Sequence, residues 1–237
     1  MQPPGNRLLQ AVPPEVRARL GAHLTPVRLP MGKVLLQPDA PVSQAYFPLD
    51  GVVALLMVMA DGTPIEVATV GNEGFVSIDA LLSAARTPYR ATCQTDVAAL
   101  RVEIGPLRAL FAESEHLRVL FLRYGAVVFS CTARALACKS EHSTAQRLAR
   151  WLLMTRDRLA ADAIPYTQEA LAGMLGVQRQ AVALAAEALK HVGAIDYRRG
   201  TVVVTDGGAL EAAACEDYRA YRDAYEALLG PISAPNA

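Results

Sequence analysis

The stretch from Thr167 to Leu189 limits the fold of this chain most strongly, because it reads as two helices joined by a tight turn. Thr167 is a suitable N-cap, since its hydroxyl can accept an amide proton of the first turn. Gly176 ends the first helix, where a sharp turn needs the left-handed backbone that glycine tolerates. Apolar residues at helical spacing give each helix an inner face (Leu171, Met174, Leu175, Val182, Ala185, Ala186 and Leu189). The pattern predicts a helix-turn-helix.

The outer face of the second helix begins with Arg179 and Gln180. In a helix-turn-helix, the N-terminal part of the second helix enters the major groove of DNA. Arginine can pair with guanine there, and glutamine can pair with adenine. These two residues are therefore candidate base readers. The alternative is an ordinary helical hairpin with a glycine in its turn.

A short hairpin is predicted directly after these helices. Ala194–Val204 reads as two short strands around Arg199-Gly200, which places Arg198 and Arg199 near the tip. A helix-turn-helix followed by a cationic hairpin is the arrangement of a winged helix, and it is more specific than either part alone.

The composition narrows the class of protein. A chain of 237 residues with 52% hydrophobic residues can form one or two domains with a sizeable core. The formal net charge is zero, which counts against a non-specific nucleic-acid coat protein, since such a protein is basic overall. It is compatible with a regulator that gathers its cations on one face.

The sequence contains no signal for a membrane span, for export or for a metal site. The longest apolar run, Val52–Ala60, is about half of the roughly 18 residues that a membrane span needs. No charged segment followed by an apolar stretch opens the chain, so we expect no signal peptide. The four cysteines form no CxxC pair and have no metal-ligand spacing (Cys93, Cys131, Cys138 and Cys215). We therefore expect a cytoplasmic protein without a metal.

Residues 1–113 are predicted to form an N-terminal domain rich in strands. Residues 1–24 read as a short helical lead-in with Pro13-Pro14 at a helix start. From Thr25 to Val102, prolines and glycines separate short apolar runs, and Asp61-Gly62 is a hairpin signal. Several strands at this spacing predict a β-sandwich or a β-roll. Together with the C-terminal helices, this gives the fold class α+β.

The stretch Val70–Thr92 is a candidate effector pocket within this domain. Backbone amides and an arginine could hold a phosphate, and a carboxylate could bind sugar hydroxyls. The candidate residues are Gly71, Glu73, Gly74, Arg86, Thr87 and Arg90. The alternative is a plain turn and helix with solvated arginines.

A long helix is predicted over residues 114–141, with Ser114 as its cap. Seven of its apolar positions alternate in spacing between four and three, as in a coiled-coil seam (Leu117, Phe121, Tyr124, Val128, Cys131, Ala135 and Cys138). We therefore expect this helix to pair with a second copy in a parallel homodimer. The alternative is that the helix packs on its own domain. A redox role for Cys131 and Cys138 is a further, weaker hypothesis.

Residues 142–229 are predicted to form the DNA-binding domain. A helix from Ser143 to Leu159 leads into the helix-turn-helix, and a helix over Ala209–Leu229 packs against the body of the domain. Residues 230–237 are expected to be a disordered tail.

The order of these parts resembles the Crp/Fnr superfamily of bacterial transcription regulators. The matching motifs are YFPLDG at Tyr46–Gly51, VGNEG at Val70–Gly74, HSTAQRLARWLL at His142–Leu153 and TQEALAGMLGV at Thr167–Val177. The resemblance implies a cyclic-nucleotide-binding-like β-roll (a jelly roll), a long dimerisation helix and a C-terminal winged helix. It also implies that bases are read by Gln178, Arg179 and Gln180, and that phosphates are held by Thr167, Arg198 and Arg199. Gln168 joins this predicted DNA-binding set.

Three departures from the family pattern bear on these implications. Asn72 separates Gly71 from Glu73, and Pro88, which follows Arg86-Thr87, has no amide proton to give an oxyanion. We therefore expect no bound cofactor, and the effector stays unidentified, with a cyclic nucleotide as one candidate. The first cysteine is Cys93, so the N-terminal cysteines of an iron–sulfur sensor are absent from this sequence. Gln178 stands where serine or threonine would cap the reading helix better.

Two functions follow from the sequence. The first is a homodimeric, sequence-specific transcription regulator that binds a palindromic site in double-stranded DNA, with RNA polymerase as a further candidate partner. Its N-terminal domain is expected to sense an unidentified effector and to reposition the DNA-binding heads through a hinge near Lys139–Ser143. The second is a small-molecule-binding module whose C-terminal domain contacts protein instead of DNA, as its acidic terminal helix would allow. No nucleophile–base set or carboxylate pair emerges from the sequence, so an enzyme is not expected.

Overall fold

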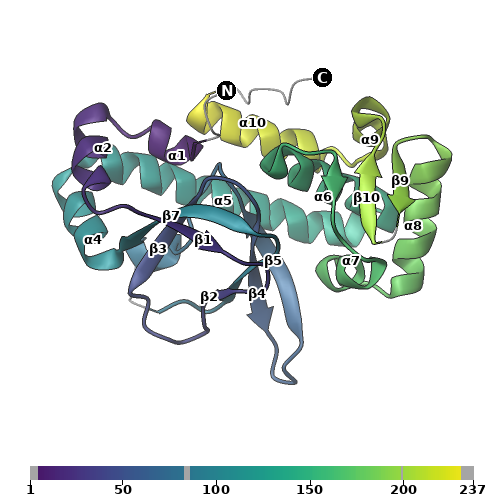
Figure 1. Cartoon of the computed structure of the whole chain (residues 1–237), viewed down its shortest axis with the longest axis horizontal. Helices are drawn as coiled ribbons and strands as arrows, with labels where there is room; N and C mark the ends of the chain where they lie inside the picture. Colours follow the sequence, from purple (N-terminus) through teal and green to yellow (C-terminus); the bar gives the residue numbers. More distant parts are fainter. Residues whose placement is uncertain (1–4, 83–85, 199, 231–237) are drawn as a thin grey trace. The chain divides into compact units, whose positions relative to one another are not determined.

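The computed structural model describes residues 5–82, 86–198 and 200–230 of the chain (Figure 1). The chain divides into two compact units. Unit 1 comprises Met1–Ser130 with Ala227–Gly230, and unit 2 includes Cys131–Glu226. The predicted tail lies outside the described residues, apart from Gly230.

Unit 1 contains two antiparallel sheets, with strand orders β1-β7-β3 and β2-β6-β4-β5. The strands are β1 (Thr25–Leu29), β2 (Val34–Leu36), β3 (Gln44–Pro48), β4 (Val53–Val58), β5 (Pro64–Val70), β6 (Arg90–Cys93) and β7 (Val97–Glu103). The helices are α1 (Arg7–Gln10), α2 (Pro14–Gly21), α3 (Ile78–Leu82) and α4 (Ile104–Glu113). The predicted β-roll is therefore confirmed.

The hairpin between β4 and β5 forms where the sequence predicted it. Gly62 has a φ of +87°, a conformation that glycine adopts without strain. The Asp61 carboxylate accepts a hydrogen bond from the backbone N–H of Thr63 at 2.9 Å. These two residues supply the turn chemistry that joins the strands.

The core of unit 1 extends into the long helix α5 (Glu115–Glu141). The ring centroids of Phe47 and Phe75 lie 4.7 Å apart, and those of Phe75 and Phe121 lie 5.2 Å apart. The Tyr124 hydroxyl accepts from the backbone N–H of Phe75 at 2.9 Å and donates to its carbonyl at 3.2 Å. The first half of α5 is therefore a core element of unit 1.

This packing corrects the predicted dimer seam. Leu117, Phe121, Tyr124 and Cys138 are almost fully buried within their own chain, so they are not available to a second copy. Val128, Cys131 and Ala135 are partly buried. Six exposed apolar residues of α5 lie on another face and also alternate in spacing between three and four (Val119, Leu122, Ala126, Phe129, Ala133 and Leu136). We call these six residues the exposed stripe.

Helix α5 is also long and apolar enough to cross a membrane, judged by length and composition alone. An 18-residue window of this helix has a mean hydropathy of 1.4, and 11% of it is buried. The prediction that no such segment exists overlooked this helix. Its apolar residues divide between a face in the core of unit 1 and the exposed stripe, which is the pattern of a helix that pairs with another helix.

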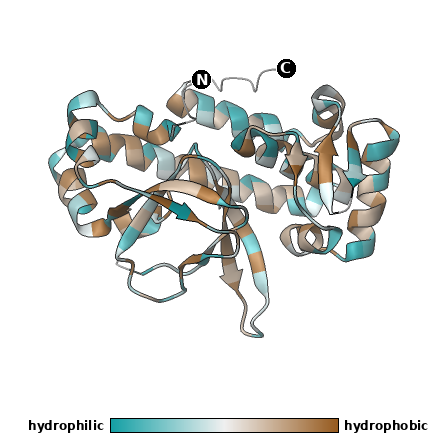
Figure 2. Cartoon of the chain, in the orientation of Figure 1, coloured by the Kyte–Doolittle hydropathy of each residue, from teal (hydrophilic) through white to brown (hydrophobic). Residues whose placement is uncertain are grey.

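Unit 2 combines helices with a small sheet of strand order β8-β10-β9. Its elements are α6 (Thr144–Leu159), β8 (Ala163–Ile164), α7 (Gln168–Leu175), α8 (Arg179–His191), β9 (Ile195–Arg198), β10 (Thr201–Val204), α9 (Gly207–Ala213) and the larger part of α10 (Asp217–Leu229). Strand β10 is hydrophobic along its valines, as its brown colour in Figure 2 shows. The predicted winged helix is therefore confirmed.

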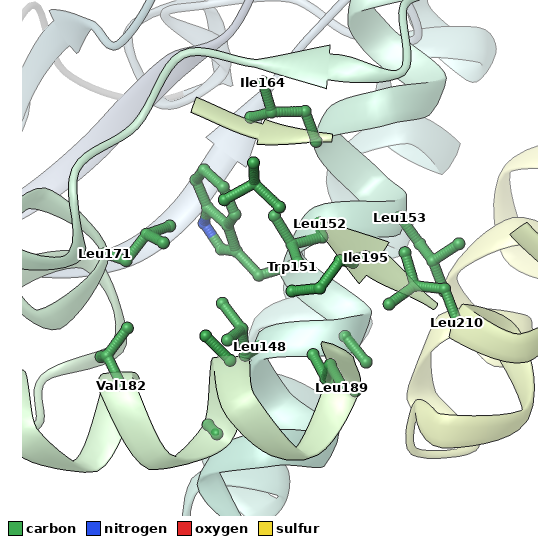
Figure 3. Close-up of a cluster of buried hydrophobic side chains, with 14 of the residues drawn as sticks. Leu148, Trp151, Leu152, Leu153, Ile164, Leu171, Val182, Leu189, Ile195 and Leu210 are labelled. Carbon is green, nitrogen blue, oxygen red and sulfur yellow. The ribbon is translucent and has the colours of Figure 1, made fainter. Parts of the chain in front are cut away.

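The core of unit 2 forms around α6. Leu148 and Leu152 are fully buried, and Trp151 packs its ring edge-on against Tyr166 at 5.1 Å between centroids. Figure 3 shows that side chains of α6 meet Leu171, Val182 and other residues of the helix-turn-helix. The start of α6 is fixed by a capping box, in which Ser143 and Gln146 satisfy each other's backbone amides.

The C-terminal segment differs from the prediction of one continuous helix. It forms two helices, α9 and α10, because Ala214 adopts an extended conformation with φ −77° and ψ 159°. The predicted inward stripe is present, since Tyr218, Tyr221 and Tyr225 are buried. The hydroxyl of Tyr218 donates to Asp157 of α6 at 3.0 Å, which anchors α10 to the domain.

Candidate nucleic-acid interface

The first helix of the motif, α7, begins at Thr167. The Thr167 hydroxyl accepts a hydrogen bond from the backbone N–H of Ala170 at 3.2 Å, so the predicted N-cap is present. Gln168 is the first residue of the helix and is partly exposed. Leu171 and Leu175 are buried in the core, which fixes the direction of the helix.

The turn between α7 and α8 depends on Gly176. Its φ of +63° is the left-handed conformation that the sequence predicted. The amide of Val177 donates to the carbonyl of Ala172 at 3.1 Å, and Arg147 donates to the carbonyl of Leu175. The helix end is therefore satisfied by the turn and by a cation from α6.

The turn presents the start of α8 to solvent. Gln178, Arg179 and Gln180 are all exposed, whereas Val182 and Leu189 on the opposite face are buried. Gln178 occupies the N-cap position, and its side chain makes no capping hydrogen bond. The Gln178 side chain is thus not tied to the first turn and can reach outward.

The starts of both helices meet the wing at one shallow depression. It is lined by Thr167, Gln168, Glu169, Arg179, Tyr197 and Gly200. The Tyr197 hydroxyl donates to the carbonyl of Tyr166 at 2.6 Å, which ties the wing to the segment before α7. Burial raises the pKa of Tyr197, so its hydroxyl stays protonated and keeps this bond.

The wing forms the predicted hairpin, with Arg198 paired to Thr201 across it. Gly200 has a φ of +81°, as expected for a turn residue. The Arg198 side chain is 77% exposed and binds the Asp196 carboxylate. Hydrogen bonds from Lys190 and Arg198 hold the pKa of Asp196 well below its usual range, so the carboxylate stays charged. Arg199 lies outside the described residues.

Sequence reasoning missed Asp196 and Tyr197. Asp196 accepts from Lys190 at 2.9 Å and from Arg198 at 2.7 Å, so it neutralises two of the cations near the wing. Residues two positions apart on a strand lie on the same face, so the sequence already indicated that Asp196 could pair with Arg198. The Tyr197 contact had no comparable signal, because Tyr166 is far away in the sequence.

The candidate effector residues are tied to backbone groups of unit 1. Glu73 is 4% exposed, and its carboxylate accepts from the backbone N–H of Gly71 at 3.0 Å. Asn6 donates to the carbonyls of Gly74 at 2.7 Å and Pro48 at 2.9 Å. The loop that carries Glu73 is thus held by its own turn and by the N-terminal segment.

The later part of the candidate pocket is divided between the surface and the interior. Arg86 is exposed and donates to the carbonyl of Asp39, while Thr87 is buried and its carbonyl accepts from the Asp39 amide at 2.9 Å. Nε of Arg90 and the hydroxyl oxygen of Thr92 are buried and have no hydrogen-bond partner in the part of the chain that the structure describes. Both residues lie on the same face of β6, since they are two positions apart.

Comparison with known proteins identifies two domains in this chain. Residues 26–114 match the model of a cyclic nucleotide-binding domain, and residues 146–213 match the model of a Crp-like helix-turn-helix domain. None of the curated proteins matches the chain.

Solved structures share the fold over most of the chain. FixK2 from Bradyrhizobium japonicum is 16% identical with a TM-score of 0.69, and the match covers 81% of this chain and 98% of that one. CLP from Xanthomonas campestris, a c-di-GMP responsive global regulator, is 19% identical with a TM-score of 0.65 over 81% and 99% of the two chains. A Crp/Fnr-family transcriptional regulator from Thermus thermophilus is 23% identical with a TM-score of 0.66 over 80% and 98%.

Proposed function

Because the chain belongs to the Crp/Fnr family of DNA-binding transcription regulators, we propose that it binds a palindromic DNA site as a homodimer. Within this proposal, Gln178, Arg179 and Gln180 read base edges in the major groove. Thr167, Gln168 and the wing arginines bind the phosphates on either side.

The main support for this proposal is the depression between α7, α8 and the wing. It brings the N-cap of one helix, Arg179 of the next and Gly200 of the wing to one surface. The start of α7 supplies backbone N–H groups that favour a phosphate, and Arg179 beside it supplies two parallel donors for a base edge. A phosphate next to the major groove and a base within that groove fit this combination.

The exposed stripe on α5 supports the homodimer. Phe129 is 77% exposed, Leu136 is 70% exposed and Leu122 is 50% exposed. Residues at this spacing interlock with the same residues of a second helix, and the pairing removes their apolar surface from water. Two copies joined in this way present two reading helices to half-sites about one helical turn (roughly 34 Å) apart.

The β-roll senses an effector within this proposal. The buried Nε of Arg90 motivates an anionic ligand, since a buried guanidinium donor is costly to leave without an acceptor. Calorimetric titration with cyclic AMP, cyclic GMP and cyclic di-GMP tests the cyclic-nucleotide class, and Arg90→Ala should abolish any heat of binding. RNA polymerase is the further partner proposed for the DNA-bound dimer, and the cytoplasm is the proposed location.

Selection of operators from a random DNA pool, followed by gel-shift titration, tests the DNA proposal. Arg179→Ala should weaken binding to the selected site by about 1–3 kcal/mol and relax sequence choice at one base position. Arg219→Ala is the control, because Arg219 is a comparably exposed arginine on α10. Equal binding by the parent protein and Arg179→Ala would contradict the reading-helix assignment.

A protein contact by the C-terminal unit is the second candidate function. Leu184 is 62% exposed and Val192 is 56% exposed, and both line a shallow depression on α8. Salt separates the two functions, because DNA binding weakens in proportion to the phosphates neutralised, whereas an apolar protein contact does not.

A further inference from the structure

Four side chains with metal-binding atoms meet in unit 2, although the sequence predicted no metal site. They are Cys138, His142, Cys215 and Asp217, and one ligand atom of each lies within 4.8 Å of those of the others. We call them the four-donor cluster. Cys138, Cys215 and Asp217 are buried, and His142 is partly buried.

Local structure explains how the four-donor cluster forms. Cys138 and His142 are four residues apart at the end of α5, and the His142 amide donates to the Cys138 carbonyl at 3.1 Å, so both lie on one helical face. Cys215 and Asp217 flank the junction between α9 and α10, where the extended Ala214 interrupts the helix. The break that the sequence did not predict is what turns Cys215 toward α5.

Three separations within the cluster are close to the edges of a tetrahedral site, and all four ligand atoms lie within 4.8 Å of one another. The two sulfurs lie 3.4 Å apart, and Sγ of Cys215 lies 3.8 Å from Oδ2 of Asp217. Nδ1 of His142 lies 3.7 Å from the same oxygen. Zinc bonds of roughly 2.0–2.3 Å place tetrahedral ligands about 3.3–3.8 Å apart, so one ion fits between them after small adjustments.

Contacts around the four-donor cluster orient its ligands as in known metal sites. Nε2 of His142 lies 3.2 Å from a carboxylate oxygen of Glu216, while Nδ1, which faces the cluster, is buried and makes no hydrogen bond to the described residues. A ligating histidine commonly donates its other nitrogen to a carboxylate in this manner. Arg134 binds Oδ1 of Asp217 at 3.4 Å, so the opposite oxygen faces the cluster.

The charge balance favours a divalent cation. Two thiolates and the carboxylates of Asp217 and Glu216 carry four negative charges, and a doubly charged ion with Arg134 and the nearby Arg150 offsets them. Arg150 acts electrostatically on both cysteines, and its Nε is buried without a hydrogen-bond partner in the described chain. Thiolate and imidazole ligands select zinc over calcium or magnesium.

We propose that the four-donor cluster binds one zinc ion as a closed structural site. With four protein ligands, no position remains for a substrate or a catalytic water. The ion fastens the end of α5 to the start of α10, immediately before α6 begins after Ser143. The inference does not depend on DNA binding, and its test does not use DNA.

Cobalt(II) is the probe, because it occupies zinc sites and its absorption reports thiolate ligands. The full-length protein is reduced, freed of metal with a chelator and titrated with Co²⁺. We expect one Co²⁺ per chain, with thiolate-to-cobalt charge-transfer bands, intense tetrahedral bands and displacement by Zn²⁺. Zn²⁺ should also raise the Tm of the protein.

Variants locate the ion. Cys215→Ser and His142→Ala should remove the tetrahedral spectrum, whereas Cys131→Ser, on the same helix but outside the cluster, should keep it. Glu216→Gln should weaken Co²⁺ binding by about 10–100-fold, since it changes only the outer contact. The Glu216 side chain is 75% exposed, so this variant tests the site even if a cysteine variant fails to fold.

Two results would overturn the proposal. One is an absence of tetrahedral Co²⁺ in the reduced protein, including the case in which Cys138 and Cys215 are isolated as a disulfide and bind no metal after reduction. The other is a spectrum that persists in Cys215→Ser and disappears in Cys131→Ser, which would place the metal elsewhere.

Discussion

Arg198 donates from Nε to the Asp196 carboxylate at 2.7 Å, within one strand of the wing. The same carboxylate accepts from Lys190 of α8 at 2.9 Å. One acidic side chain therefore holds two cations that a DNA phosphate would otherwise attract. The wing's affinity for DNA should be limited by this internal competition.

Replacement of Asp196 tests this competition. Asp196→Asn removes the negative charge, so we expect tighter binding to DNA of any sequence. The slope of log K against log salt should become more negative by about 0.9 for each additional phosphate neutralised. Fluorescence anisotropy at several salt concentrations measures both effects. Asp61→Asn, in the β4–β5 hairpin, is the matched control, and an unchanged slope in Asp196→Asn would show that Asp196 does not keep Arg198 or Lys190 from a phosphate.

The exposed stripe predicts the effect of a charge on assembly. Phe129→Glu places like charges opposite each other in the proposed seam, so the dimer should lose about 2 kcal/mol or more, roughly a 30-fold rise in Kd. Sedimentation equilibrium measures the change. Met31→Glu adds the same charge at a residue of unit 1 that is 59% exposed, and it should leave the dimer intact. A dimer unaffected by Phe129→Glu would exclude this face.

The cap of α7 predicts a paired effect on stability and on DNA binding. Thr167→Ala removes the hydroxyl that accepts the Ala170 amide, which should cost about 1 kcal/mol of unfolding free energy and weaken DNA binding through the lost phosphate contact. Thr167→Ser keeps the hydroxyl, so it should retain most of the stability and most of the affinity for DNA. Urea denaturation and gel-shift titration measure the differences. If alanine and serine gave equal stability, the cap would contribute nothing.

The core of unit 2 predicts a larger loss of unfolding free energy than the cap of α7 does. Leu152 is fully buried, and Leu152→Ala should cost about 2–5 kcal/mol by removing apolar contacts and leaving a cavity. Leu184→Ala, at a leucine that is 62% exposed, should change stability by less than about 0.5 kcal/mol. Thermal and chemical unfolding of both variants provide the comparison. Similar losses in the two would contradict the core assignment.

Features that depend on neighbours within one helical turn could be predicted from the sequence. The Thr167 cap and the left-handed Gly176 each use atoms no more than four residues away. Their chemistry is local, so residue type and spacing were sufficient. The same holds for the Asp61-Gly62 turn.

The sequence of α5 alone does not show which of its two apolar faces lies in the core. The helix carries two apolar stripes of heptad spacing, and the prediction selected the one that contains Phe121. That side chain packs against Phe47 and Phe75, which come from distant parts of the chain. Periodicity shows that a stripe exists, but only the tertiary partners decide which stripe lies in the core.

The four-donor cluster shows the same limit for a site. Cys138 and Cys215 are 77 residues apart in the sequence, and neither belongs to a local ligand motif. The short extended step at Ala214 brings them together, and apolar periodicity had predicted helix through that position. The sequence shows that Cys138 and His142 lie close together, but it does not show that Cys215 and Asp217 complete the cluster.

The two hydrogen bonds that Asn6 donates have a practical consequence for dissecting this regulator. A fragment that starts at Thr25, where the first strand begins, would lack Asn6. The buried carbonyls of Pro48 and Gly74 would then lose the hydrogen bonds that Asn6 donates to them. The loop around Glu73 would be less firmly held in this fragment, so ligand-binding tests on it would not report on the intact β-roll. Fragments of unit 1 should therefore begin before Asn6.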